Sequence, residues 1–277
     1  MTDYYTVSQL KDNVYRITCA DETFCELLVG TEKAMLIDTG FGYGDLRGVV
    51  EKYIDGKPLI IANTHAHFDH SCGNGQFSED IYIGDGDIEL CRKHTSEKAR
   101  RNAVKRGEEL GSLPENFDAD AYVSQGSGNL VPLYDGDVFD LGEITIRAVS
   151  APGHSAGSMC FLYVEENWLY TGDAACSYCW LFLREFCGKD VYLATLDKLI
   201  ALNPAKHFSS HMPNASGVEA FHLYKRAVLE ADFSKGFPFK SPFAGGDEVR
   251  VCVIDGMTPD DIENPNFASV IICETFS

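Results

Sequence analysis

The chain has 277 residues, of which 45% are hydrophobic, so it is long enough to bury a sizeable core and to fold by itself. Its acidic residues outnumber its basic residues by 42 to 23, which gives a formal net charge of −19. Because such a surface repels phosphate backbones and anionic lipid headgroups, we expect neither nucleic acid nor a membrane as a partner.

The expected compartment follows from features that the sequence lacks. The N-terminal segment has neither the basic region nor the apolar region of a secretion signal. No apolar run reaches the roughly eighteen residues that a membrane span needs. The ten cysteines are scattered without the regular spacing of a disulfide scaffold. We therefore expect a cytoplasmic protein with reduced thiols.

Short apolar runs bounded by turn signals follow one another along the chain and predict strands with helices between them. In chain order, we expect strands at 14–19, 24–30 and 33–40, a helix at 45–54, strands at 58–65 and 81–84, a helix at 85–110, an irregular segment at 111–129, strand pairs at 137–154 and 158–175, a helix at 189–202, a strand at 205–211, a helix at 217–231, and strands at 248–255 and 267–276. Two groups of strands with helices between and after them predict two sheets faced by helices.

No linker, repeat or low-complexity segment marks a domain boundary. We therefore expect a single domain over residues 1–277, with a helical or loop insertion at about 85–130 and a C-terminal strand extension at about 232–277. The basic cluster at 93–106 is interrupted by Glu97 and is expected to form the solvated face of a helix. The sequence leaves the oligomeric state open.

The segment THAHFDH at 64–70 contains three of the eight histidines and begins where a buried strand is expected to end. His65 and His67 are alternate residues of an extended segment, so their imidazoles point the same way and can converge on one ion. Imidazole nitrogen and carboxylate oxygen are ligands that zinc accepts. Asp69 and His70 follow so closely that they would strain to reach the same ion, but they can serve a second ion nearby.

A site for two metals needs more ligands than this loop provides, and three further strand ends offer them. His154 lies in the turn APGHSAGS after the apolar run TIRAVS. Asp173 follows a strand in LYTGDAAC, and His211 does the same in FSSHMP. Because four strand ends carry residues that bind metals, we expect these side chains to meet at one site.

Together with LIDTG around Asp38, these motifs resemble those of the metallo-β-lactamase superfamily of metallohydrolases, in the same order and over about residues 14–215. The resemblance implies an α/β fold, the αββα sandwich of two mixed β-sheets flanked by helices, with the site at one edge. It also implies that Asp38 orients the site from behind the ligands. The implied ligands are His65, His67 and His154 for one metal, Asp69, His70 and His211 for the other, and Asp173 as a bridge between them.

The resemblance also implies a reaction. Bound zinc lowers the pKa of water to about 7, so a hydroxide that bridges the metals can attack a carbonyl at neutral pH. We therefore predict hydrolysis of a small-molecule ester, thioester or lactone, with Asp69 as a catalytic residue that moves a proton. The expected cofactors are two divalent metal ions, with Zn²⁺ as the default and Fe or Mn accepted by the same ligands.

Differences between this sequence and other members of the superfamily argue against some of the possible activities. Asp173 stands where true β-lactamases of the cysteine-bearing type have a thiolate, so antibiotic hydrolysis is disfavoured. Flavodiiron and nucleic-acid-cleaving relatives carry extra domains for which this sequence gives no sign. A thioester hydrolase like the hydroxyacylglutathione hydrolases and a lactonase both remain open. The alternatives of another class are a mononuclear iron oxygenase of the persulfide-dioxygenase type and a non-catalytic metal-binding protein.

Several other residues have simpler expected roles. The pair Cys176 and Cys179 is expected to be two ordinary thiols. Cys72 is expected near the metals, a position that would make it a candidate for oxidation. His94 and His222 are expected on the surface. His207 is expected about a dozen ångströms from His211, either as a supporting residue behind the ligands or as a structural residue. Substrate choice is expected to depend on residues 95–130 and on the segment after His211. The aromatic residues expected to line the substrate pocket are Phe117, Tyr122, Tyr178, Trp180 and Phe182.

Overall fold

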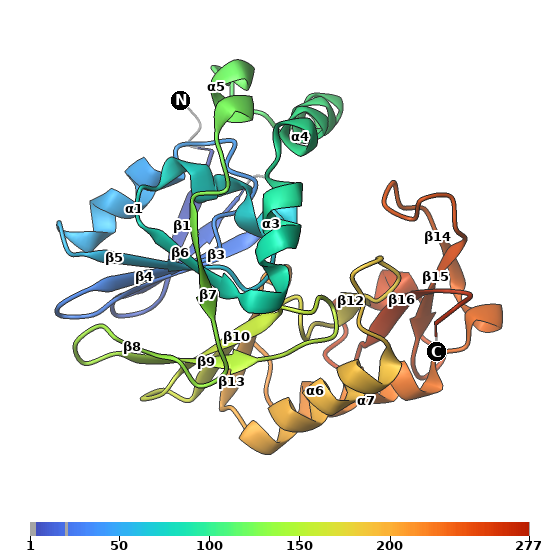
Figure 1. Ribbon diagram of the computed structural model, residues 1–277. Helices are drawn as coiled ribbons and strands as arrows, with labels where there is room; N and C mark the ends of the chain where they lie inside the picture. Colours follow the sequence, from blue (N-terminus) through green and yellow to red (C-terminus); the bar gives the residue numbers. More distant parts are fainter. Residues whose placement is uncertain (1–3, 20–21, 277) are drawn as a thin grey trace.

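The computed structural model describes residues 4–19 and 22–276. Met1 and Ser277, which are the ends of the predicted single domain, lie outside the described residues. The strands form three sheets, and the two larger sheets stack face to face (Figure 1).

The first sheet has seven strands that are hydrogen-bonded in chain order. These strands are β1 (Thr6–Lys11), β2 (Val14–Thr18), β3 (Phe24–Val29), β4 (Ala34–Ile37), β5 (Leu59–Ala62), β6 (Asp80–Gly84) and β7 (Asn129–Leu133). The pairings up to β4 are antiparallel, and those from β4 to β7 are parallel. The helix α1 (Leu46–Ile54) connects β4 to β5 and buries Leu46, Val50 and Ile54 on one face at a spacing of four residues. Asp45 begins this helix by accepting a hydrogen bond from the backbone N–H of Gly48.

The second sheet has five strands in the order β13-β11-β10-β9-β8. These strands are β8 (Val138–Asp140), β9 (Thr145–Ser150), β10 (Met159–Tyr163), β11 (Trp168–Gly172) and β13 (Lys206–Ser209). Only the β11–β13 pairing is parallel, so this sheet is also mixed.

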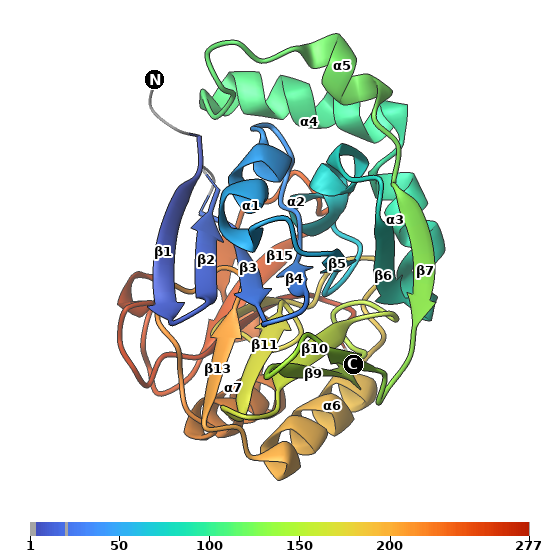
Figure 2. The same ribbon diagram turned by 90° about the vertical axis from the view of Figure 1, so that its left-hand side faces the viewer.

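Successive side chains of β10 point to opposite faces of the second sheet, and this shows how the layers are packed. Met159 and Phe161 belong to the core between the two large sheets. Cys160 and Leu162 point to the opposite face, where they join the core formed with α6 (Lys189–Leu202) and α7 (Glu219–Glu230). Figure 2 shows α1 outside the first sheet and α6 beyond the second. The predicted αββα sandwich is therefore confirmed.

The third sheet has four strands and was not expected as a separate layer. It consists of β12 (Tyr178–Trp180), β16 (Ser269–Cys273), β15 (Val249–Val253) and β14 (Phe237–Phe239), in that order. The strands β15 and β16 lie within two predicted strands, whereas β12 and β14 have three residues each and are too short to show alternation. The four strands lie together at one side of the molecule (Figure 1). Because β12 follows Asp173 by five residues, this sheet is built beside the predicted site.

The segment predicted as one helix at 85–110 contains two, α3 (Ile88–His94) and α4 (Glu97–Leu110). The break lies at Ser96, whose hydroxyl accepts a hydrogen bond from the N–H of Ala99 and so begins α4. A short helix, α5 (Ala119–Ser124), lies within the segment expected to be irregular. Short 3₁₀ turns occupy Cys72–Gln76, Asp85–Asp87, Phe233–Lys235 and Pro259–Asp261. In the described part of the chain, no helix combines the length and the apolar character needed to cross a membrane.

The prediction that the basic cluster at 93–106 is only a solvated face is wrong at Arg100. This side chain is fully buried and donates hydrogen bonds to the carbonyls of Thr95, Cys72 and Gly126. The guanidinium can be buried here because Nε and Nη2 have backbone partners and the group lies over the ring of Tyr122, although Nη1 has no hydrogen-bond partner among the described residues. Arg100 therefore holds α4 against the segment that follows the histidine motif.

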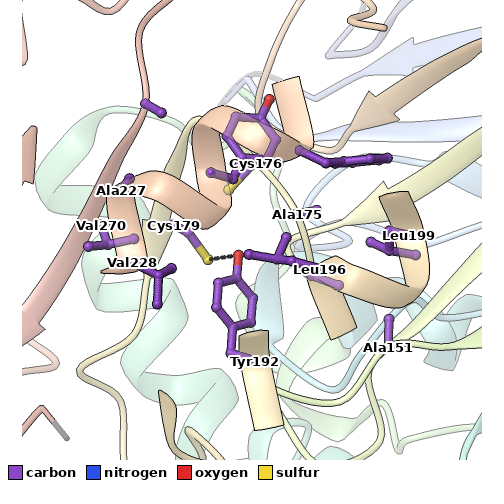
Figure 3. Close-up of a cluster of buried hydrophobic side chains, with 14 of the residues drawn as sticks. Ala151, Ala175, Cys176, Cys179, Tyr192, Leu196, Leu199, Ala227, Val228 and Val270 are labelled. Carbon is purple, nitrogen blue, oxygen red and sulfur yellow. Dashed lines mark hydrogen bonds between the residues drawn. The ribbon is translucent and has the colours of Figure 1, made fainter. Parts of the chain in front are cut away.

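The pair Cys176 and Cys179 lies in the apolar core between the second sheet and the C-terminal helices (Figure 3). The hydroxyl of Tyr192 donates to the Cys179 sulfur at 3.1 Å, and Leu196 packs in the same cluster. The interaction with Cys179 and burial raise the pKa of the Cys176 thiol well above its usual range. All ten cysteines lie within the described residues and are free thiols. This environment suits structural thiols better than reactive ones.

Candidate metal centre

Loops that follow strand ends bring the predicted ligands together. The strands β4 and β5 are parallel neighbours in the first sheet, and β11 and β13 are parallel neighbours in the second. The carboxyl ends of parallel neighbours meet at the same edge, so the loops after these four strands lie close together. Gly172 allows the closest approach, since a Cβ atom there would lie 2.5 Å from the Thr64 hydroxyl. Its φ of +54° is also one that glycine adopts readily.

Three histidines form the first group of possible ligands, which we call the three-histidine cluster (His65, His67 and His154). The Nδ1 atom of His67 lies 3.0 Å from Nε2 of His65 and 3.0 Å from Nε2 of His154. All three residues are buried, with exposed fractions of 1, 7 and 2%. Three nitrogens that face one another at this spacing form a set that can hold one metal ion.

The second group, the aspartate cluster, consists of Asp69, His70 and His211. The one-turn helix α2 (Phe68–Ser71) carries Asp69 and His70. The Oδ2 atom of Asp69 lies 3.7 Å from Nε2 of His70 and 3.5 Å from Nε2 of His211. His211 is the most exposed of the seven predicted ligands, with 36% of its side chain accessible.

Asp173 lies between the two clusters and presents one oxygen to each. Its Oδ1 atom is 3.6 Å from Nε2 of His70 and 3.4 Å from Nε2 of His211. Its Oδ2 atom is 3.8 Å from Nε2 of His154 in the other cluster. The structure therefore brings all seven predicted ligand residues to one place, with the carboxylate of Asp173 in the middle.

The unsatisfied atoms of the site test whether a metal fits. Among the described residues, Nε2 of His70 and Oδ1 of Asp173 are buried without a hydrogen-bond partner. Buried polar atoms normally have partners, and those that lack one call for an explanation such as an ion. The ligand atoms of each possible group lie within 4.8 Å of one another. Imidazole nitrogens and carboxylate oxygens at this spacing fit a divalent metal.

Hydrogen bonds behind the ligands fix which nitrogen faces the centre. Asp38 accepts from Nδ1 of His70 at 2.9 Å, and it also accepts from the backbone N–H and the hydroxyl of Thr64. The carbonyl of Trp180 accepts from Nδ1 of His154 at 2.9 Å. Both histidines are thus left with Nε2 for a metal. Asp38 takes the orienting role that the sequence implied.

Glu185 is a supporting residue that the sequence did not predict. Its Oε1 atom lies 2.6 Å from Nε2 of His67, so that Nδ1 of His67 is left to face the other two histidines. Burial opposes ionisation of Glu185, but the hydrogen bond from His67 outweighs it and lowers the pKa of the carboxyl group to about 2. The stretch around this residue, FLREFCGK, shows no ligand spacing, because the partner of Glu185 lies 118 residues away.

The charges of the aspartate cluster favour a cation. Burial opposes protonation of His70 and His211, but the carboxylates of Asp173 and Asp69 outweigh it and raise the pKa of both histidines, that of His211 to about 9. Burial also opposes ionisation of Asp173, and here His211 and His70 outweigh it and hold its pKa well below the usual range. In the three-histidine cluster, burial and the neighbouring histidines lower the pKa of His65. Neutral imidazole is the form that binds metals.

The prediction that His94 is a surface residue is wrong. Its ring lies 5.5 Å from that of His67, and its Nδ1–H donates to the carbonyl of Ala66. His207 is buried against Phe221 and Tyr224, which agrees with the structural role expected for it. His222 is exposed on α7, as predicted.

Cys72 lies two residues after the motif, and it is fully buried. Burial raises the pKa of its thiol to about 11. A thiol with such a pKa is protonated at neutral pH and reacts slowly. The hypothesis that Cys72 is sensitive to oxidation is therefore not favoured by its surroundings.

A cavity of about 440 Å³ opens over the two clusters. Five aromatic rings line it, and we call them the aromatic wall: Phe41, Phe68, Tyr178, Trp180 and Phe243. Leu183, Met212 and Ile262 add further apolar surface. The cavity is thus polar where the predicted ligands lie and apolar on the surrounding wall, as small-molecule sites usually are.

The predicted pocket aromatics are only partly correct. Tyr178 and Trp180 line the cavity, and Phe182 packs against Trp180 with ring centroids 5.3 Å apart. Phe117 and Tyr122 line a different cavity of about 900 Å³ beside α4 and α5, which includes none of the seven predicted ligands. Their prediction failed because Phe117 and Tyr122 pack on Tyr43 instead of reaching the site.

Comparison with known families agrees with the fold and with the motifs. The model of the metallo-beta-lactamase superfamily matches residues 21–211. The chain belongs to the metallo-β-lactamase superfamily, as the motifs predicted.

Two curated relatives have names that describe an activity. The acyl-coenzyme A thioesterase MBLAC2 of Homo sapiens is 27% identical over 223 residues, which cover 72% of this chain and 77% of that protein. The atrochrysone carboxyl ACP thioesterase AgnL7 of Paecilomyces divaricatus is 28% identical over 197 residues, which cover 69% of this chain. The matched region spans 51% of AgnL7, so about half of that relative has no counterpart in the comparison.

Solved structures share the fold at low sequence identity. The metallo-beta-lactamase family protein TTHA1429 from Thermus thermophilus has a TM-score of 0.55 and 20% identity, with 79% of this chain and 80% of that chain covered. The sec-alkylsulfatase Pisa1 from Pseudomonas sp. has a TM-score of 0.60 and 13% identity, with 81% of this chain and 42% of that chain covered. Because these proteins have different names and the same fold, the fold alone does not define the reaction.

Proposed function

We propose that this chain, a hydrolase of the metallo-β-lactamase superfamily, cleaves small-molecule acyl thioesters with two divalent metals. The observation that carries the proposal is the position of Asp173, which directs one carboxylate oxygen to each of two ligand clusters. The apolar cavity above the clusters supports an acyl substrate. The names of the two thioesterase relatives support the thioester class.

In this proposal the three-histidine cluster holds one metal, the aspartate cluster holds the other, and Asp173 contacts both. Zinc suits these nitrogen and oxygen ligands, and iron or manganese accepts them as well. When bound, the two metals supply a water activated for attack at neutral pH and a positive charge that polarises the substrate carbonyl.

The residues of the chain do the remaining work. Asp69 lines the cavity and is partly exposed, so its carboxylate is placed to accept a proton from the attacking water and to return it to the sulfur of the leaving thiolate. Asp38 and Glu185 hold His70 and His67 in the orientation that the metals require. The aromatic wall excludes water from the acyl group and positions it over the site.

The test is hydrolysis of three matched substrates by metal-loaded protein. We would compare a hexanoyl thioester with the corresponding oxygen ester and with a six-carbon lactone, and measure zinc, iron and manganese per chain. The matched variants are His65→Ala, which removes a ligand, and His222→Ala, which removes an exposed histidine on α7.

We expect the thioester to be hydrolysed fastest by protein that holds about two metals, and we expect this activity to be lost in His65→Ala and kept in His222→Ala. If the lactone were hydrolysed faster than the thioester, we would conclude that the substrate is a lactone. One iron per chain together with oxygen consumption would favour an oxygenase. A metal-loaded protein that turns over none of the three would contradict the proposal.

A further inference from the structure

Most arginines of this acidic chain have a carboxylate within ion-pair distance. Arg16, Arg47, Arg92, Arg101, Arg226 and Arg250 are paired in this way. Arg100 instead donates to backbone carbonyls. Among the described residues, no ion pair with a carboxylate is found for Arg106, Arg147 or Arg184. With 42 acidic residues in the chain, unpaired guanidinium groups are unexpected.

Two of these three arginines line the cavity over the candidate metal centre. Arg106 comes from α4, and its guanidinium carbon lies 5.7 Å from the centre of the Phe243 ring. Arg184 comes from the loop after β12. Its Nη2 atom would lie 3.7 Å from a Cβ atom added at Gly245. Two elements that are 78 residues apart therefore bring positive charge to one cavity, close to the segment 243–245.

The charges in this cavity are separated by depth. Arg106 and Arg184 are exposed, as is Phe243 with an exposed fraction of 38%. Asp69 and Asp173 are partly buried among the histidines. The carboxylates thus lie at the floor, where the metals are proposed, and the guanidinium groups lie at the rim.

We propose that Arg106 and Arg184 bind an oxyanion of the substrate, either a phosphate on its thiol carrier or a carboxylate at the far end of its acyl group. This inference rests on the proposed thioesterase function. A guanidinium matches phosphate and carboxylate oxygens with paired N–H donors, and a ring beside it keeps its plane in place. A net charge of −19 repels anions at long range, so an anionic substrate needs cations of this kind at the site.

The surface of the cavity between the arginines and the ligand clusters indicates the chemical character of the remaining part of the substrate. Phe68 and Phe243 have ring centroids 5.3 Å apart, and Trp180 lies 6.2 Å from Phe243. These rings separate the arginines from the ligand clusters with apolar surface. The substrate class is therefore an amphipathic thioester that is apolar next to the scissile bond and anionic at a distance from it.

The experiment compares three thioesters. Hexanoyl-coenzyme A carries phosphates on the thiol side, hexanoyl-N-acetylcysteamine carries no charge, and glutaryl-N-acetylcysteamine carries a carboxylate on the acyl side. The double variant Arg106→Gln/Arg184→Gln removes both cations. The matched control is Arg147→Gln, since Arg147 is also unpaired and exposed but lies on β9 outside the cavity.

We expect the double variant to raise KM for one anionic substrate by about tenfold or more, with kcat and metal content unchanged. An effect on hexanoyl-coenzyme A identifies a phosphate of the carrier as the ligand, and an effect on the glutaryl compound identifies a carboxylate. The neutral thioester and the Arg147→Gln control should show no change. Added salt should reduce the advantage of the anionic substrate in the parent protein.

Two failures can be told apart by the neutral thioester. If hexanoyl-N-acetylcysteamine is hydrolysed but the double variant treats all three compounds as the parent protein does, the arginine proposal is wrong and the thioesterase function stands. If none of the three is hydrolysed by metal-loaded parent protein, the thioesterase function itself is wrong.

Discussion

Five of the seven predicted ligands line the same cavity as the aromatic wall, but the ligands and the wall are held in different ways. The ligands are fixed by hydrogen bonds from buried partners such as Asp38, and they follow strands of the two large sheets. The wall is held by ring packing, and part of it comes from β12 and from the segment near β14, which belong to or adjoin the third sheet. The predicted ligands and the aromatic rings are therefore held by different interactions, and each set should respond to its own substitutions.

The largest effect is expected from Asp173→Asn. This change keeps the shape of the side chain and removes the charge between the clusters, so metal content should fall and kcat should drop on the order of 1000-fold. Elemental analysis and initial rates measure the two quantities. Asp190→Asn, at an exposed position in the first turn of α6, is the control. If the variant bound two metals and kept the parent kcat, Asp173 would have no role in metal binding or in the reaction.

Glu185→Gln should weaken metal binding without changing the ligands. Because Glu185 fixes His67, the loss should be about 10- to 100-fold in metal affinity. Competition with a chelator measures this affinity, and Glu185→Asp should restore part of it. Glu263→Gln, at an exposed position, should match the parent protein. Equal chelator sensitivity of all variants would show that Glu185 does not position His67.

Trp180→Leu should change the wall and leave the metals in place. The His154 contact uses the backbone carbonyl of Trp180, so it survives the substitution. Loss of ring contact should raise KM for hexanoyl thioesters by about tenfold and affect acetyl thioesters less. Phe239→Leu is the control, because Phe239 packs against Trp180 but does not line the cavity. An equal rise for both acyl lengths would contradict a role in acyl binding.

The smallest effect concerns His207, which lies outside both the ligand set and the wall. Burial lowers the pKa of His207 from 6.5 to about 4. Between these values the unfolded chain binds a proton that the folded chain does not, so this residue lowers the free energy of unfolding as pH falls, by about 1.4 kcal/mol per pH unit. His207→Gln should therefore flatten the pH dependence of stability between pH 6.5 and 5.5.

Urea unfolding at several pH values measures this dependence. The control is His222→Gln, which replaces an exposed histidine on α7 and should keep the slope of the parent protein. A slope in His207→Gln equal to that of the control would mean that His207 is protonated in the folded protein as easily as in the unfolded chain.

The sequence predicted those parts of the molecule whose signals are local. His65 and His67 are alternate residues after a buried strand, and this spacing is visible without a structure. The two large sheets were predictable for a similar reason, since strands such as β10 are continuous apolar runs that are buried on both faces.

The features that were missed depend on contacts between distant segments. His94 faces the site because α3 packs beside the loop that contains Ala66. Arg100 is buried because three backbone carbonyls surround it, although its neighbours in sequence are charged. Glu185 is 118 residues from His67, and no local sequence pattern around either residue indicates that they are in contact. Such roles arise only when tertiary packing selects one orientation of a side chain.

The loop after β12 places Arg184 at the rim of the cavity and the next residue, Glu185, against His67. In the proposed function, a single peptide bond therefore joins a residue that contacts the substrate to one that positions a metal ligand. We expect that replacing this loop to admit new substrates would also displace the Glu185 carboxylate and weaken metal binding. Changes of substrate specificity in this loop are therefore restricted. Phe243 instead packs against Phe68, Trp180 and Arg106, so substitutions in its segment should alter substrate fit without displacing a carboxylate that supports a predicted ligand.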